Sequence, residues 1–162
     1  MHSYIAYDIN HLGFSTQIGK WMVSDGTVTL DEAKPQNSKV NVTIKVGDII
    51  TGVPKLNEHL MGPDFFDVKK FPTAIFISDK VTVTGKNKAI VRGMLTIRDI
   101  TKPVTLNVTL DKLGPNLITN KQTAGFTATT HLKRSDFGMT TLLPLLGDDV
   151  KIDIGAEANK AS

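Results

Sequence analysis

Apolar and polar residues alternate along most of the chain with a period of two. The alternation is clearest at residues 104–110, where Val104, Leu106 and Val108 are separated by Thr and Asn. This period predicts strands with one buried and one solvent-exposed face, as in antiparallel sheets. About eight segments show it: 3–9, 17–30, 40–46, 73–84, 89–98, 104–110, 124–132 and 150–156. Turn residues separate these segments, so the sequence predicts an all-β sandwich or barrel.

The segment 17–30 changes phase partway along. Trp21 stands at an odd position, whereas Val28 and Leu30 stand at even positions. A single strand can keep all of these side chains on its buried face only if it contains one extra residue. We therefore predict a β-bulge near Asp25–Gly26.

Residues 53–71 depart from the alternation. Pro54 suits the first turn of a helix, and Leu56 and Leu60 follow at helical spacing. Gly62–Pro63 is typical of a helix end. The sequence thus predicts a short helix near 54–61, of the kind that closes one end of a barrel.

Residues 135–149 form a second irregular segment. We expect a small helical turn near 135–138, followed by a loop rich in leucine at 142–146. Loops normally run over the wet surface of a protein, so a leucine-rich loop is unusual and indicates a role beyond connecting two strands.

Composition narrows the possible classes of protein. The chain has 162 residues and no cysteine, which excludes disulfides, thiol nucleophiles and thiolate metal sites. No apolar run approaches the ~18 residues of a membrane-spanning helix, so we expect no stable membrane insertion. The formal charge is +3, from 19 basic and 16 acidic residues without a one-signed block, and we expect no nucleic-acid partner. We predict one domain, residues 1–158, with a flexible tail at 159–162.

The sequence contains none of the short motifs of nucleophilic, phosphate-binding or metal chemistry. The four histidines are dispersed along the chain, and an isolated His is more often a surface or hydrogen-bonded residue. Asp64 and Asp67 flank the predicted helix end, and Asp148–Asp149 precede a strand, where Asp caps or turns are common. We therefore predict no catalytic residue, no metal site and no cofactor.

The predicted interior is apolar and modest in side-chain size. Its inward positions are mostly Val, Ile, Leu, Ala and Thr, with Phe14, Phe76 and Phe126 as the large exceptions. A barrel of eight strands is wide enough to be filled by side chains or to hold one small ligand. The pattern alone leaves both possibilities open.

Five blocks of sequence resemble the YceI-like family in the right order along nearly the whole chain. The chain opens with H-S-Y-I-A-Y-D-I-N-H-L-G and ends with V-K-I-D-I-G-A-E-A. Between them stand H-L-M-G-P-D-F-F-D-V-K-K-F-P-T-A-I-F, G-M-L-T-I-R-D-I-T-K-P-V-T-L and A-G-F-T-A-T-T-H-L-K-R-S-D-F-G-M. The resemblance implies an eight-stranded, lipocalin-like antiparallel barrel that binds, and carries or sequesters, a polyisoprenoid lipid such as a polyprenyl phosphate or an isoprenoid quinone, without catalysis.

The same resemblance indicates which residues contact the ligand. Phe65 and Phe66 match the family block that leaves the helix, and Trp21 stands where the family usually has Phe. The leucine-rich loop could form the mouth of the cavity or a homodimer interface. Together with the inward positions, the candidate ligand-binding residues are Phe14, Trp21, Ile44, Leu60, Phe65, Phe66, Phe76, Met94, Phe126, Met139, Leu142 and Leu143. Arg134 and Asp136 lie in a matching turn, which we expect them to brace rather than to bind an anionic head group.

Two other classes of function stay open. A glycan-binding domain would use Trp21 and the tyrosines on an exposed face. An enzyme acting on a lipid-linked substrate would need a polar cluster inside the barrel, such as His11 with Arg92 or Arg98.

The resemblance to the YceI-like family also implies a small bacterial protein of a kind often made under stress. The resemblance implies a periplasmic or secreted location, or a cytoplasmic one if Met1 is the natural start.

Overall fold

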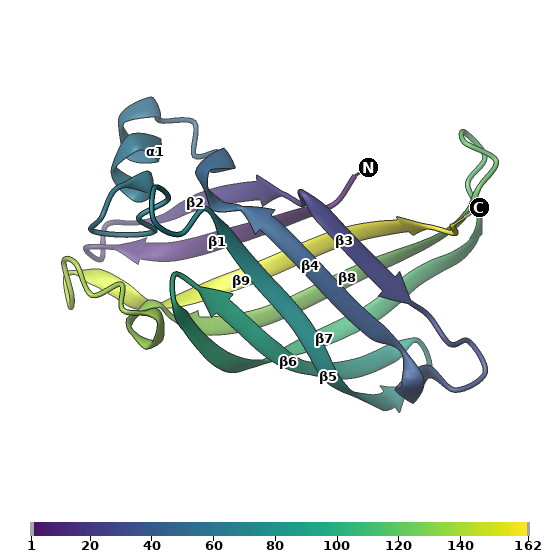
Figure 1. Cartoon of the computed structure of the whole chain (residues 1–162). Helices are drawn as coiled ribbons and strands as arrows, with labels where there is room; N and C mark the ends of the chain where they lie inside the picture. Colours follow the sequence, from purple (N-terminus) through teal and green to yellow (C-terminus); the bar gives the residue numbers. More distant parts are fainter. Residues whose placement is uncertain (1, 162) are drawn as a thin grey trace.

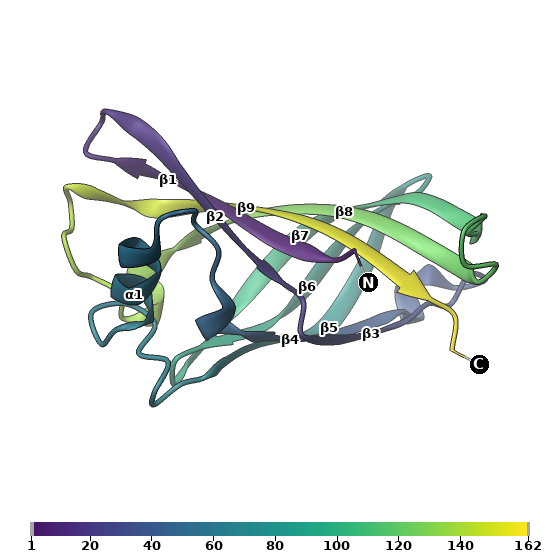
Figure 2. The same ribbon diagram turned by 90° about the horizontal axis from the view of Figure 1, so that it is seen from above.

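The computed structural model describes residues 2–161 and consists mainly of one antiparallel sheet. The spatial order of its strands is β2-β1-β9-β8-β7-β6-β5-β4-β3. The strands are β1 (Tyr4–His11), β2 (Ser15–Met22), β3 (Asp25–Thr29), β4 (Lys39–Lys45), β5 (Thr73–Gly85), β6 (Lys88–Ile97), β7 (Ile100–Pro115), β8 (Gln122–Lys133) and β9 (Leu146–Asn159). The sheet curls strongly into a half-barrel (Figures 1 and 2). The prediction of an all-β antiparallel architecture is confirmed.

The structure has nine strands rather than eight, because residues 17–30 form two of them. β2 and β3 are the opposite edges of the sheet, and only Val23 and Ser24 connect them. The predicted bulge at Asp25–Gly26 is wrong, since β3 pairs with β4 without a register shift from its first residue to its last. The change of phase instead marks the point where the chain leaves one edge of the sheet and starts the other.

Three contacts hold the chain together where these edges approach each other. Lys20 of β2 pairs with Ile50, which follows β4, through two backbone hydrogen bonds of 3.0 and 2.9 Å. The Val23 N–H donates to the Ser3 carbonyl at 3.0 Å, and the Lys45 N–H donates to the Ser24 hydroxyl at 2.9 Å. The sheet therefore curves around a partly enclosed interior.

The helical elements lie where the sequence predicts them. α1 (Pro54–Met61) begins at the predicted proline and ends at Gly62, whose N–H donates to the His59 carbonyl. The 3-10 turn η3 (Arg134–Phe137) ends at Gly138, which has the left-handed φ of 75° that glycine adopts without strain. Two further 3-10 turns, η1 (Pro35–Asn37) and η2 (Val46–Asp48), flank β4. No helix among residues 2–161 is long and apolar enough to cross a membrane.

The half-barrel has two distinct ends. The helix end carries α1, η3 and the turn at 12–14, and the distal end carries the connections 30–38, 86–87 and 116–121 (Figure 1). The best-packed part of the core belongs to the helix end. Its buried members are Phe65, Phe76, Val91, Val104, Phe137 and Met139.

The chain returns to the distal end along β9. Asn159 belongs to that strand, and the Lys160 N–H donates to the Gln122 carbonyl at 2.8 Å. The first two residues of the expected tail are therefore bonded to the sheet, and Ser162 lies outside the described residues.

Candidate ligand-binding cavity

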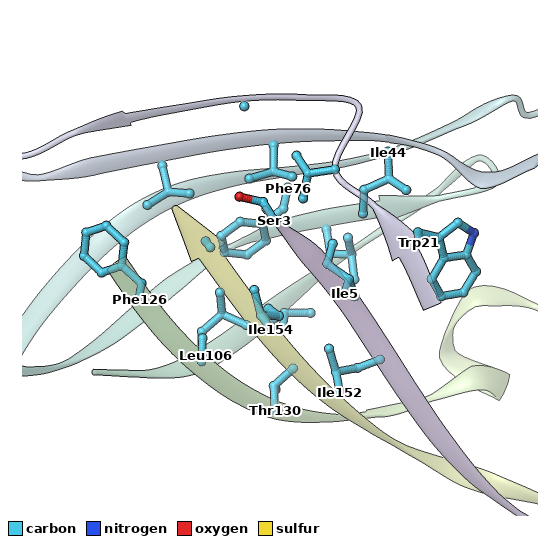
Figure 3. A pocket seen from close by; sticks show the side chains of 18 of the residues that line it. Ser3, Ile5, Trp21, Ile44, Phe76, Leu106, Phe126, Thr130, Ile152 and Ile154 are labelled. Carbon is cyan, nitrogen blue, oxygen red and sulfur yellow. The ribbon is translucent and has the colours of Figure 1, made fainter. Parts of the chain in front are cut away.

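A cavity of about 1630 Å³ occupies the interior of the half-barrel. This volume exceeds the roughly 300–1,000 Å³ that is usual for small-molecule sites. Side chains from β1, β8 and β9 point into it together, and Trp21 and Phe126 stand at opposite sides of the view in Figure 3. Residues of both ends of the half-barrel line it, so the cavity extends along the barrel and suits an elongated ligand.

The walls are apolar because strand geometry sends alternate side chains inward. On β9, Ile152 and Ile154 face the cavity, and on the neighbouring β8, Ala128 and Thr130 do so. Alanines are frequent toward the distal end, where Ala124 and its neighbours line the wall. These small side chains leave the interior unfilled, whereas the phenylalanines of the helix end pack against one another.

Three polar side chains on the inner wall are hydrogen-bonded to the protein. The Thr130 hydroxyl donates to the Thr105 carbonyl at 2.8 Å, and the Trp21 indole N–H donates to the Val46 carbonyl at 3.0 Å. The Ser3 hydroxyl accepts the Glu157 N–H at 3.0 Å. Since these groups already have partners, the central wall presents mainly carbon to a ligand.

An aromatic cluster forms the wall near the helix end. The Trp21 ring lies 5.5 Å from Tyr7 and 5.4 Å from Phe66 between centroids, the second pair edge to face. Tyr7 also covers Gly19 on the paired strand, where a Cβ would meet the Tyr7 ring at 2.5 Å. Burial raises the pKa of the Tyr7 hydroxyl. Tyr7 was not among the candidate ligand-binding residues, although its position two residues after Ile5 in an alternating strand signals the inner face.

Nine of the twelve sequence-predicted residues line the cavity. They are Trp21, Ile44, Leu60, Phe65, Phe66, Phe76, Phe126, Met139 and Leu142. The other three do not. Phe14 lies in the turn before β2 and is 87% exposed, Met94 points outward between the inward positions Gly93 and Leu95, and the half-buried Leu143 of the loop does not line the cavity.

Arg134 braces the loop that follows η3, as expected, but not through Asp136. Its side chain is 5% exposed, and the guanidinium donates to the carbonyls of Gly147 at 2.8 Å, Met139 at 2.9 Å and Leu146 at 3.0 Å. Burial lowers the pKa of Arg134, and the nearby Asp148 carboxylate opposes that effect. The guanidinium thus ties both ends of the 139–146 loop to the turn.

Asp148 holds the same turn from the other side. Its carboxylate accepts the Ser135 hydroxyl at 2.7 Å and the Ser135 N–H at 2.8 Å. These two hydrogen bonds, the hydroxyl bond first, lower the pKa of Asp148.

We expect protonation of the Asp148 carboxylate in acid to destabilise the protein. A carboxyl whose folded-state pKa lies below its unfolded value, about 3.9 for Asp, stabilises the fold above that value. The contribution is lost as pH falls through the folded-state pKa. Urea unfolding from pH 7 downward should therefore show a decline below about pH 4 that is shallower in Asp148→Asn. Ser135→Ala should flatten the same part of the curve, and an unchanged acid slope in both variants would contradict the assignment.

The polar cluster that an enzyme on a lipid-linked substrate would need is not assembled. His11 lines the cavity, but Arg92 lies on the outer face, where it pairs with Asp79 at 2.9 Å. The Arg98 guanidinium donates to the Gly138 carbonyl and stacks over Phe71. Among residues 2–161, no group of three His, Asp or Glu side chains is placed to hold a metal ion.

The exposed platform that a glycan site would need is also missing at Trp21. The indole is 7% exposed and packs with Tyr7 and Phe66, so it presents no exposed ring face to solvent. Tyr4 is on the outer surface, over Gly155. The two aromatic residues therefore do not share one face.

Comparison with known proteins finds relatives in sequence and in fold. Protein YceI of Salmonella arizonae is 37% identical over 156 residues, which cover 96% of this chain and 81% of that protein. The crystal structure of Burkholderia cenocepacia BcnA superposes with a TM-score of 0.87 at 28% identity, covering 96% of both chains. A polyisoprenoid-binding domain from Saccharophagus degradans, implicated in plant cell wall breakdown, shares the fold with a TM-score of 0.68 at 13% identity, over 99% of this chain and 94% of that one. Residues 1–158 match the YceI-like domain, and the chain therefore belongs to the YceI-like family.

Proposed function

We propose that this protein binds a polyisoprenoid chain in its cavity and carries or sequesters that lipid without catalysis. The observation that carries the proposal is the elongated apolar cavity of about 1630 Å³, in whose wall the Thr130 hydroxyl and the Trp21 indole N–H already have protein partners. Such a wall favours a hydrocarbon chain, because burial of apolar surface needs no polar complement. The name of the Saccharophagus degradans domain, a relative in fold, supports the same class of ligand.

The leucine-rich loop supports entry at the helix end. Leu142 and Leu145 are exposed to solvent and also line the cavity, as an apolar rim requires. Arg134 fixes this loop by its three carbonyl contacts, so the rim is held in place. The homodimer through 139–146 stays a proposal beside this one.

Affinity should rise with the length of the isoprenoid until the cavity is full. At about 0.3 kcal/mol for each non-hydrogen atom, a five-carbon unit contributes ~1.5 kcal/mol. That corresponds to about a tenfold decrease in Kd for each added unit. Units that extend beyond the mouth should add little.

Organic extraction of natively purified protein, followed by mass spectrometry, tests the proposal directly. We expect an isoprenoid in the extract and, after delipidation, uptake of added prenyl alcohols in the stated order of length. Trp21 is the single tryptophan and lines the cavity, so its emission reports binding. A folded protein that contains no isoprenoid and takes up none would overturn the proposal.

A further inference from the structure

The β7–β8 hairpin presents two apolar side chains to solvent at its tip. Leu117 is 87% exposed and Ile118 is 92% exposed. The hairpin lies at the distal end, opposite α1, where it projects beyond the sheet (Figure 1). Two adjacent large aliphatic side chains in this position make no contribution to the core.

The tip is a structured turn. The Asn116 side-chain carbonyl accepts the Ile118 N–H at 2.9 Å and the Thr119 N–H at 3.2 Å. The backbone of Asn116 also donates to the Lys121 carbonyl at 2.8 Å and accepts the Asn120 N–H at 2.7 Å. The turn therefore holds Leu117 and Ile118 outward, in a fixed place.

Exposed lysines lie at the distal end that carries this apolar tip. Five exposed lysines belong to the hairpin, the neighbouring β5–β6 turn and the end of the chain, namely Lys86, Lys88, Lys112, Lys121 and Lys160. In the described part of the chain, none of the five forms an ion pair with a carboxylate. Near the tip the acidic side chains are Asp111, which accepts the Thr127 hydroxyl, and the half-buried Glu157, and the 30–38 connection adds Asp31 and Glu32 together with Lys34. Basic side chains therefore outnumber acidic ones at the distal end.

The same region adjoins the cavity. Leu113 of β7 and Gln122 of β8, which stand on either side of the tip, line the cavity, as do Lys88 and Lys160. A surface that covers the tip would thus lie next to the distal part of the cavity.

We infer that the distal end docks on an anionic membrane surface, with Leu117 and Ile118 in the interface and Lys112, Lys121 and Lys160 at the level of the lipid head groups. Apolar side chains beside lysines suit a lipid interface, where each basic residue is attracted to anionic lipid. The patch is much smaller than the 20–30 residues a side of a stable protein interface, and lysine is depleted at such interfaces. This inference concerns the outer surface and goes beyond the proposed function, because it stands whatever occupies the cavity.

Co-sedimentation of the full chain with lipid vesicles tests the docking. We expect binding to vesicles of phosphatidylcholine with phosphatidylglycerol, little binding to phosphatidylcholine alone, and release at about 1 M salt, where the Debye length is about 3 Å. Leu117→Asp with Ile118→Asp should weaken binding at least about a hundredfold, about tenfold for each side chain. Lys112→Gln with Lys121→Gln should weaken it about 25-fold.

Phe14→Asp is the matched control. Phe14 is as exposed as Leu117 but lies at the helix end, so this variant should bind vesicles like the natural sequence. Equal loss in the Phe14 and tip variants, binding without preference for anionic lipid, or self-association through the tip in sedimentation would each overturn the inference. Isoprenoid retention is measured on the same samples by extraction. If the natural protein retains isoprenoid but does not bind vesicles, the docking inference is refuted and the proposed function is not.

Discussion

Replacing Ala128 by Trp should lower the isoprenoid content of the natively purified protein at least about tenfold while leaving the protein folded. Ala128 is 5% exposed and stands midway along β8, between Val108 and Ile154 on the paired strands, with its side chain on the cavity wall. An indole at this point would occupy the space through which an extended chain must pass. Insertion into a packed core normally costs about 1–3 kcal/mol, but here the new ring enters empty space and buries apolar surface.

The comparison variant is Thr127→Trp, one residue earlier on the same strand. Thr127 points outward, is exposed and loses only its hydrogen bond to Asp111 on substitution. Mass spectrometry of extracts should show at least a tenfold lower isoprenoid content in Ala128→Trp and an unchanged content in Thr127→Trp. Thermal melting by circular dichroism should show both variants folded. Equal isoprenoid content in the two variants would mean that the ligand does not lie in the cavity.

Most of the cavity wall could be predicted from the sequence, because strand parity fixes the face of each side chain. Ile44, Phe76 and Phe126 were placed inside by alternation within their own strands, and the structure puts each of them there. Met94 follows the same rule on the outward face. Its neighbours Gly93 and Leu95 have inward parity, so its own outward position was readable from the same pattern.

The features that sequence alone could not provide depend on which strands become neighbours. Parity within 17–30 detects a change of phase, but an added residue and a change of strand produce the same signal. Only the strand order shows that β2 and β3 are opposite edges of the sheet. Phe14 fails for a related reason, since a residue in a turn belongs to neither face of a strand.

The bracing of the loop by Arg134 was foreseeable only in part. An Arg two residues before an Asp predicts a local pair, yet the guanidinium reaches carbonyls up to thirteen positions away in the chain, at Gly147, Leu146 and Met139. A sequence does not indicate which backbone carbonyl accepts a hydrogen bond, because every residue has one. The partner of a buried Arg therefore has to be taken from the fold.

Replacing Arg134 by Met should cause the largest loss of stability among the substitutions considered. Met keeps most of the buried volume but removes three charge-assisted hydrogen bonds, and it leaves the carbonyls of Met139, Leu146 and Gly147 without their donor. At about 1–3 kcal/mol for each buried group left without its partner, the loss is at least about 3 kcal/mol. We expect the low end, ~3 kcal/mol, because Leu146 and Gly147 are only half-buried and water can reach them. Denaturant unfolding measures this loss, and the Tm should fall by about 10 °C.

Lys133→Met separates the hydrogen bonds of Arg134 from the general effect of removing a positive charge. Lys133 is the preceding residue and is exposed, so its replacement should change the free energy of unfolding by less than about 0.5 kcal/mol. Because Arg134 ties down both ends of the 139–146 loop, Arg134→Met should also increase amide hydrogen exchange at Leu142 and Leu146, ahead of exchange in β8. Equal stability of the two variants, or uniform exchange throughout the sheet in Arg134→Met, would show that the carbonyl contacts do not hold the rim of the cavity.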